Sequence, residues 1–185
     1  MKFYIVEYKE FEMAEGMTVM EKRILSILVD NTSGVLTRIA GLFARRGYNI
    51  DSITAGVTAD PRFTRITIVT SGDELVLEQI KNQVQKQVDV RDIKILNADT
   101  SVIRELALLK LRVSEAERDK VLAVANIFRA KIVDVGTNSI IIELTGSQSK
   151  LEAFFELTKE YETLELARTG ITALSRGMDD VTYLD

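Results

Sequence analysis

The sequence of 185 residues contains no cysteine and no histidine. These two absences exclude disulfide bonds, thiol nucleophiles, imidazole bases and the usual ligands of zinc. Catalysis by this chain would have to use carboxylate, lysine, tyrosine or serine groups, or magnesium held by oxygen ligands. The sequence also lacks a Gly-x-Ser-x-Gly motif, a phosphate-binding loop and a calcium-binding loop. Few kinds of catalytic or metal site therefore remain open to it.

Basic charge and long apolar runs are scarce as well. The net charge is −4 and the isoelectric point is about 5.1, which gives no indication of a phosphate-backbone partner. No apolar run approaches the roughly 18 residues that a membrane-spanning helix needs. The N-terminal residues have one lysine ahead of an apolar run that Glu7 interrupts, so a secretory signal is not expected. With the lack of disulfides, these features favour a cytoplasmic protein.

The clearest pattern lies between residues 24 and 51. Alternating apolar residues predict a strand over about 23–29. Apolar residues at steps of three and four then predict an amphipathic helix over about 34–46. Gly47 follows and suits the left-handed conformation that ends many helices. The stretch is therefore expected to form a strand, a tight turn, a helix and the start of a second strand.

The polar turn at residues 30–34 is a candidate ligand site. The first backbone N–H groups of a helix have no partner within the helix, and a glycine at this point leaves room for a ligand. Such a site suits a small anion, including a carboxylate. The amides of Asn31 and Asn49 add donors and acceptors for an ammonium or carboxylate group. A simpler interpretation also fits: Asn31 or Ser33 caps the helix, and Asn49 is an ordinary turn residue.

The rest of the first half predicts further strands and one more helix. Asp73 is expected to cap that helix. The order becomes βαββαβ, the ferredoxin-like unit with one antiparallel sheet and two helices on one face. The predicted elements are strands over about 48–58 and 63–70, a helix over about 74–87 and a strand over about 89–96.

The second half repeats this architecture with a different sequence. Ser114 and Glu117 predict a capping box at the start of its first helix, and residues 136–138 predict a hairpin turn. The last strand is expected to break or bend near Gly170. The predicted elements are strands over about 104–113, 131–135, 139–146 and 162–174, with helices that end near residues 129 and 160.

We therefore predict an α+β protein with two ferredoxin-like βαββαβ domains in tandem. The predicted division is an N-terminal extension at 1–21, a first domain at 22–97, a linker at 98–103, a second domain at 104–177 and a tail at 178–185.

The outer face of the first sheet, opposite its helices, is expected to expose apolar residues such as Ile24 and Leu28. An exposed apolar sheet face or edge is typical of a protein interface. We expect a homodimer in which the first sheets pair edge to edge or across their faces. The alternative is that the second half covers the first within one chain. The sequence leaves both arrangements open.

The run NTSGVLTRIAGLFARRGYNIDSITAG, followed by DPRFTRITIVTSGDELVLEQIKNQVQKQVDV, closely resembles the small regulatory subunit of acetohydroxyacid synthase, also called acetolactate synthase. The segments IFRAKIVDV, KLEAFF and ARTGITALSRG of the second half resemble the same family. The resemblance covers about residues 22–177 and identifies the first half as an ACT domain, a ferredoxin-like module that senses amino acids. A run of this length is far more specific than the fold alone.

This resemblance implies a regulatory subunit that is not itself an enzyme. Members of the family bind a catalytic subunit dependent on thiamine diphosphate, raise its activity and confer feedback inhibition by valine in branched-chain amino acid biosynthesis. The implied partners are the large catalytic subunit, a second copy bound through the ACT domains, and valine. No nucleic acid, membrane or metal is expected on this chain. Thiamine diphosphate (ThDP), FAD and magnesium are expected on the catalytic subunit.

The resemblance also places the effector between two ACT domains. Backbone N–H groups over residues 34–36 would hold its carboxylate, asparagine side chains and nearby carbonyls would hold its ammonium group, and apolar neighbours would fit a branched side chain. The leader at 1–21 has no counterpart in the family pattern, and Thr32 stands where the family often has an acidic or other polar residue. The matching effector positions are Asn31, Gly34, Val35 and Leu36 in one subunit and Asn49 and Ile50 in the facing subunit.

Three other functions share the predicted fold. RNA-recognition domains stack bases on aromatic residues of their central strands, and the strands here carry none. For an independent enzyme, the candidate aspartates are scattered through turns and strands, where solvated faces or helix caps explain them better. An ACT sensor for a different enzyme would bind an amino acid without activating acetohydroxyacid synthase. The sequence does not assign the surface that contacts the catalytic subunit, the stoichiometry, or the choice among valine, leucine and isoleucine.

Overall fold

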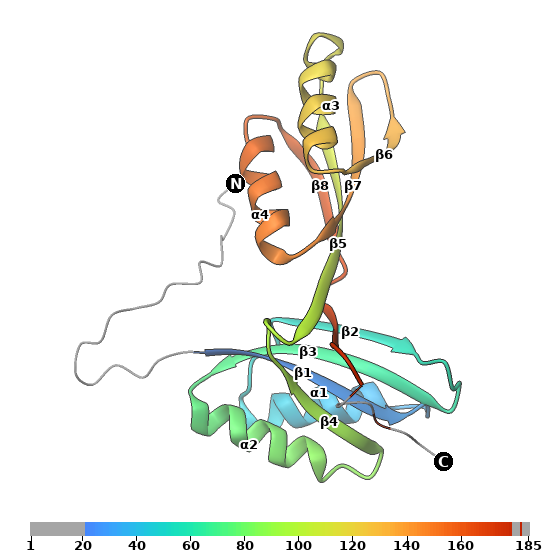
Figure 1. The fold of residues 1–185 in the computed structure, drawn as a ribbon, viewed down its shortest axis with the longest axis vertical. Coiled ribbons are helices and arrows are strands. Elements are labelled where there is room, and N and C mark those ends of the chain that lie inside the picture. Colours follow the sequence, from blue (N-terminus) through green and yellow to red (C-terminus); the bar gives the residue numbers. More distant parts are fainter. Residues whose placement is uncertain (1–20, 179–181, 183–185) are drawn as a thin grey trace, which may run out of the picture. The chain divides into compact units, whose positions relative to one another are not determined.

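The computed structural model describes residues 21–178 and Thr182. The predicted N-terminal extension therefore lies almost entirely outside the described residues. The chain divides into two compact units (Figure 1). The N-terminal unit comprises the described residues up to Val102 together with those from Ile171 onward, and the C-terminal unit comprises Ile103–Gly170.

The N-terminal unit has the predicted βαββαβ order. Its four strands form an antiparallel sheet in the order β2-β3-β1-β4. Helices α1 and α2 lie on one face of this sheet (Figure 1). The elements are β1 (Glu21–Asp30), α1 (Val35–Arg46), β2 (Ser52–Val57), β3 (Phe63–Gly72), α2 (Glu74–Gln85) and β4 (Val90–Leu96).

The end of α1 and the start of α2 lie where the sequence predicts. Gly47 closes α1 in the left-handed conformation, with φ of 69°, and its N–H donates back to Ala44 and Phe43. Asp73 caps α2, because its carboxylate accepts a hydrogen bond of 2.7 Å from the Val76 N–H. Local sequence signals therefore place the end of α1 and the start of α2 correctly, whereas α2 ends at Gln85, two residues before the predicted end.

The core of this unit lies between the helices and the sheet. Alternate residues of β1, namely Leu25, Ile27 and Val29, point to the helices and are almost fully buried. Phe43 of α1 and Ile80 of α2 pack against them. The apolar residues that recur every two positions in the strand thus pack against those that recur every three to four positions in the helices.

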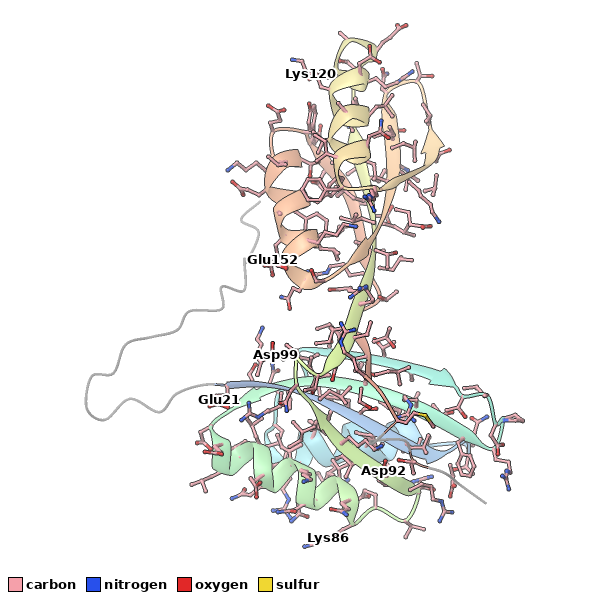
Figure 2. The ribbon with its side chains drawn as sticks, viewed as in Figure 1. Glu21, Lys86, Asp92, Asp99, Lys120 and Glu152 are labelled. Carbon is pink, nitrogen blue, oxygen red and sulfur yellow. The ribbon has the colours of Figure 1, made fainter. Side chains whose placement is uncertain are left out.

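The outer face of the sheet differs from the prediction, since Leu28 is buried rather than exposed. The short strand β9 (Thr172–Ser175) contacts β1 and β4 and pairs with β5 (Ser101–Arg112), which begins in this unit. Ile171 and Ala173 are buried there. Thr182 donates a hydrogen bond to Asp92, which Figure 2 labels on β4. The predicted second domain at 104–177 thus includes residues that the structure assigns to the N-terminal unit.

The C-terminal unit repeats the architecture. Its strands follow the order β6-β7-β5-β8, the same permutation as in the first sheet. The apolar core again lies under two helices and includes Leu109, Ile142 and Phe154. The further elements are the short helix η1 (Glu115–Glu117), α3 (Arg118–Ile127), β6 (Lys131–Val135), β7 (Ser139–Gly146), α4 (Gln148–Thr158) and β8 (Thr163–Arg168).

Local predictions for this half are confirmed in detail. The Glu117 carboxylate accepts a hydrogen bond of 3.0 Å from the Ser114 N–H, which completes the capping box. The hairpin turn closes through Gly136, whose N–H donates to Ser139 over 2.8 Å. The last strand breaks at Gly170, which has φ of 82°. The expected linker at 98–103 is shorter than predicted, because β5 begins at Ser101.

One ion pair of the C-terminal unit is largely buried. Arg168 of β8 donates two hydrogen bonds of 2.7 Å to the carboxylate of Glu105 on β5. The Glu105 side chain is only 4% exposed. The Arg168 guanidinium also lies 5.9 Å from the ring centre of Phe155. Because the carboxylate is out of contact with water, removing its partner would leave a buried charge uncompensated.

Arg168→Met leaves the Glu105 carboxylate buried without its partner. We expect the free energy of unfolding to fall by about 3 kcal/mol, and Glu105→Leu in the same chain to recover most of this loss. Urea denaturation measures the effect. The control is Arg112→Met, which breaks an exposed pair with Glu162 and should change stability by less than about 1 kcal/mol. Equal losses in both single variants would contradict this account.

Ala173→Asp places a carboxylate where β9 covers the first sheet. Ala173 is 3% exposed, so we expect a loss of about 2 kcal/mol or release of the segment. Leu174→Asp is the control, because Leu174 on the same strand is 58% exposed and the change there should fall within about 0.5 kcal/mol. Thermal unfolding compares the variants. Matching melting curves would show that this segment does not stabilise the sheet.

Candidate functional site

The turn after β1 is held by the loops on either side of it. The Asp30 N–H donates to the carbonyl of Asp89 over 2.9 Å, and the Asn31 N–H donates to the carbonyl of Arg62 over 2.7 Å. Asp30 also pairs with Arg91 of β4 through its carboxylate. The turn therefore has a fixed position at the end of the sheet, set by backbone hydrogen bonds from two other connections.

The Asn31 side chain fixes the turn further. Its amide nitrogen donates to the Pro61 carbonyl over 2.9 Å, and its oxygen accepts from the Thr64 hydroxyl over 3.1 Å. Within the described residues no side chain caps α1, so the simpler interpretation of Asn31 or Ser33 as a cap is wrong. Asn31 instead joins the turn to the loop between β2 and β3.

Gly34 stands at the mouth of α1. Its φ of 83° is a left-handed conformation that favours glycine. The Val35 N–H donates weakly to Thr32 over 3.4 Å, and the Val35 side chain is buried in the core. The Leu36 side chain is half exposed beside the turn. The N-terminus of α1 thus has backbone N–H groups that no described side chain caps and an exposed apolar side chain close in sequence, features that suit a small amphipathic anion.

Sequence reasoning missed two charged residues at this turn. Arg38 donates from Nε to the Asp89 carboxylate over 2.6 Å and lies close to the Ser33 carbonyl. The Thr32 hydroxyl also lies 3.5 Å from Asp89. The hydrogen bond from Arg38 lowers the pKa of Asp89 below its ordinary value. No local signal could reveal this pair, because its members are separated by 51 residues in the sequence.

Asn49 and Ile50 lie away from the turn in the same chain. The Asn49 amide donates to Asp51 over 2.5 Å, and its carbonyl accepts from Thr70 over 2.6 Å. Asn31 contacts Thr64, and Thr64 and Thr70 are six residues apart on β3, which corresponds to about 20 Å. The predicted effector positions therefore form two half-sites at opposite ends of one sheet.

An exposed apolar surface lies along the edge strand β2, and we call it the β2 surface. In the described part of the chain β2 pairs only with β3. Its Ile53 is 40% exposed and its Val57 is 60% exposed, both on the helix-bearing face. Leu36 and Ala40 of α1 are exposed one helical turn apart. An open strand edge beside an apolar stripe is typical of a surface that pairs with another chain.

The equivalent turn of the C-terminal unit differs in its chemistry. The Arg112 N–H donates to the Glu162 carbonyl and the Val113 N–H donates to the Asn138 carbonyl, as at the first turn. A groove of about 370 Å³ opens there and is lined in part by Glu117 and Glu162. Because the Glu117 carboxylate already caps the helix, this turn does not suit an anion.

Two classes of site are absent from the described residues. Between residue 21 and residue 178 no helix is long and apolar enough to span a membrane. In the same part of the chain no three acidic residues come together as a metal site.

Family models match most of the chain. The model for the AHAS small subunit-like ACT domain matches residues 25–92. The model for the small subunit of acetolactate synthase matches residues 104–177. These two ranges agree with the extent of the resemblance in the sequence.

Individual relatives match over nearly their full length. The chain is 46% identical over 158 residues to the probable acetolactate synthase small subunit of Methanothermobacter thermautotrophicus, covering 85% of this chain and 94% of that protein. It is 45% identical over 157 residues to the acetolactate synthase isozyme 3 small subunit of Escherichia coli, covering 84% and 96%. The crystal structure of the acetolactate synthase small subunit from Thermotoga maritima superposes with a TM-score of 0.79 at 40% identity, covering 85% of this chain and 99% of that chain. The chain therefore belongs to the family of acetolactate synthase small subunits.

Proposed function

We propose that this chain activates the catalytic subunit of acetohydroxyacid synthase and confers feedback inhibition by valine. Membership of the small-subunit family supports the regulatory role and a large catalytic partner in branched-chain amino acid biosynthesis. The observation that carries the effector assignment is the N-terminus of α1 at Gly34, which no described side chain caps and which is followed by the half-exposed Leu36. A free amino acid has the carboxylate and the side chain that such a site suits.

Each part of valine has a matching group in this proposal. Its carboxylate meets the N–H groups at Gly34–Leu36. Its ammonium group meets the free acceptor capacity of the Asn31 oxygen, of Asn49 and of nearby carbonyls. Its isopropyl group packs against Leu36 and Ile50, one from each half-site.

The site is completed by a second copy of the chain. The two half-sites lie about 20 Å apart in one copy, so a single chain does not surround a ligand as small as valine. A two-fold axis across the β2 surface places the Asn49 end of one sheet against the Asn31 end of the other. The exposed Ile53 and Val57 support pairing of the sheets edge to edge. Pairing across the outer faces is disfavoured, because residues 171–175 cover part of that face.

Inhibition follows from differential binding. Valine held by both copies stabilises one arrangement of the dimer relative to another. It shifts the catalytic subunit only by its difference in affinity for the two arrangements, typically about 1–3 kcal/mol. The chain itself acts in the cytoplasm, without catalytic residues and without a cofactor. Thiamine diphosphate, FAD and magnesium act on the catalytic subunit.

Calorimetric titration with valine tests the effector assignment. We expect saturable binding that is stronger for valine than for serine, because the apolar neighbours suit a branched aliphatic side chain. Leucine and isoleucine are the comparisons that show whether the site also selects by the size of that side chain. The same titration in the presence of the catalytic subunit would detect a site that forms only in the complex. Absence of binding in both would contradict the sensing role, and failure to raise the activity of the catalytic subunit would contradict the regulatory role.

Gly34→Asp is expected to abolish inhibition by valine while activation is retained. The new side chain places a β-carbon and a carboxylate in the helix mouth and strains a left-handed residue. Assays of the catalytic subunit with and without valine measure both effects. Gly177→Asp is the control for backbone strain, because Gly177 also has positive φ and nothing lies within 4 Å of the β-carbon that it would carry. A Gly34 variant that responds to valine like the wild type would refute the site.

A further inference from the structure

Arg38 occupies an unusual electrostatic position. It lies in the first turn of α1, where the unpaired N–H groups of the helix already favour negative charge. That turn, Val35–Arg38, contains no acidic residue. A cation at this end of a helix is unfavourable unless anions lie close to it. Asp89 supplies one such anion.

The Asp89 carboxylate holds the guanidinium in a defined orientation. Nε of Arg38 donates to one oxygen of this carboxylate over 2.6 Å, and the Thr32 hydroxyl lies 3.5 Å from the other oxygen. Asp89 is itself fixed, since its carbonyl accepts the Asp30 N–H. The contact through Nε leaves the opposite edge of the guanidinium, formed by the two terminal nitrogens, available for a second carboxylate.

The free edge borders the space in front of Gly34. A β-carbon built on Gly34 would lie 3.0 Å from Nη1 of Arg38. Nη1 donates to the Ser33 carbonyl over 3.4 Å, which is a long hydrogen bond. A group in front of the helix mouth therefore meets both the backbone N–H groups and the Arg38 guanidinium.

We propose that Arg38 binds the carboxylate of the amino-acid effector through its terminal nitrogens, with Asp89 as the residue that positions it. This inference rests on the proposed effector site and adds to it the residue that selects for a free carboxylate. Recognition of this kind is planar and directional. An amide or ester of the same amino acid is then bound poorly, since it offers the guanidinium no negative charge.

The test compares valine with valinamide on wild-type and variant proteins. Calorimetry on the full chain gives the affinity ratio for the two ligands. We expect the wild type to bind valine much more tightly than valinamide. In Arg38→Gln the ratio of the two affinities should fall by at least about tenfold. Arg38→Lys keeps the charge and the pairing with Asp89 but lacks the planar edge, so we expect it also to lose much of the preference.

Arg45→Gln is the matched control. Arg45 lies in the last turn of the same helix, so the change in net charge is identical and the ligand preference should stay that of the wild type. Thermal unfolding of each variant shows whether it is folded. The ratio of the affinities for valine and valinamide shows whether Arg38 contacts the carboxylate. A residue that only maintains the shape of the turn would, when replaced, weaken the binding of both ligands.

Two outcomes overturn the proposal in different ways. If both Arg38 variants fold and retain the wild-type preference for valine over valinamide, Arg38 does not contact the carboxylate, while the effector site itself stands. If the wild-type protein binds neither ligand, alone or with the catalytic subunit, the proposed sensing function fails and this inference fails with it.

Discussion

Everything at the candidate site depends on two backbone hydrogen bonds. The Asp30 and Asn31 N–H groups donate to carbonyls of two different connections, before β4 and after β2. They fix the end of β1, and that fixes the direction in which α1 begins. Gly34 can then adopt its left-handed conformation, and no described side chain caps the helix there. The C-terminal unit has the same pair of hydrogen bonds but closes its helix mouth with Glu117. One scaffold thus presents a receptive turn in one unit and an occupied turn in the other.

The faces of a sheet that are covered determine which surfaces remain exposed for interaction with other chains. In the N-terminal unit the helices cover one face, and residues 171–175 cover part of the other. The edge at β2 stays open and runs between the two half-sites, while the other edge strand, β4, is contacted by α2 and β9. Edge pairing under two-fold symmetry is therefore the arrangement we propose, because it would both join two copies and complete the proposed site. In this account dimerisation and effector binding are consequences of the same uncovered strand.

Local sequence signals predicted most of the fold. The period of apolar residues, the Asp73 cap, the Ser114–Glu117 capping box and the break at Gly170 depend on neighbouring residues, and each is found in the structure. Long-range relations were not accessible in this way. Burial of Leu28 depends on a strand that arrives about 145 residues later, and the Arg38–Asp89 pair joins elements 51 residues apart. The effector residues came from the resemblance to a family, and the structure adds that they lie at opposite ends of one sheet.

The most direct test of this account is binding of valine to a mixed dimer. One copy carries Gly34→Asp, which blocks the half-site at the helix mouth, and the other carries Asn49→Ala, which weakens the opposite half-site. If each site is made by two copies, each variant alone has no intact site, whereas the purified mixed dimer has about half the sites of the wild type, with wild-type affinity. Absence of any intact site in the mixed dimer, in a protein that remains dimeric and folded, would contradict a site shared between copies.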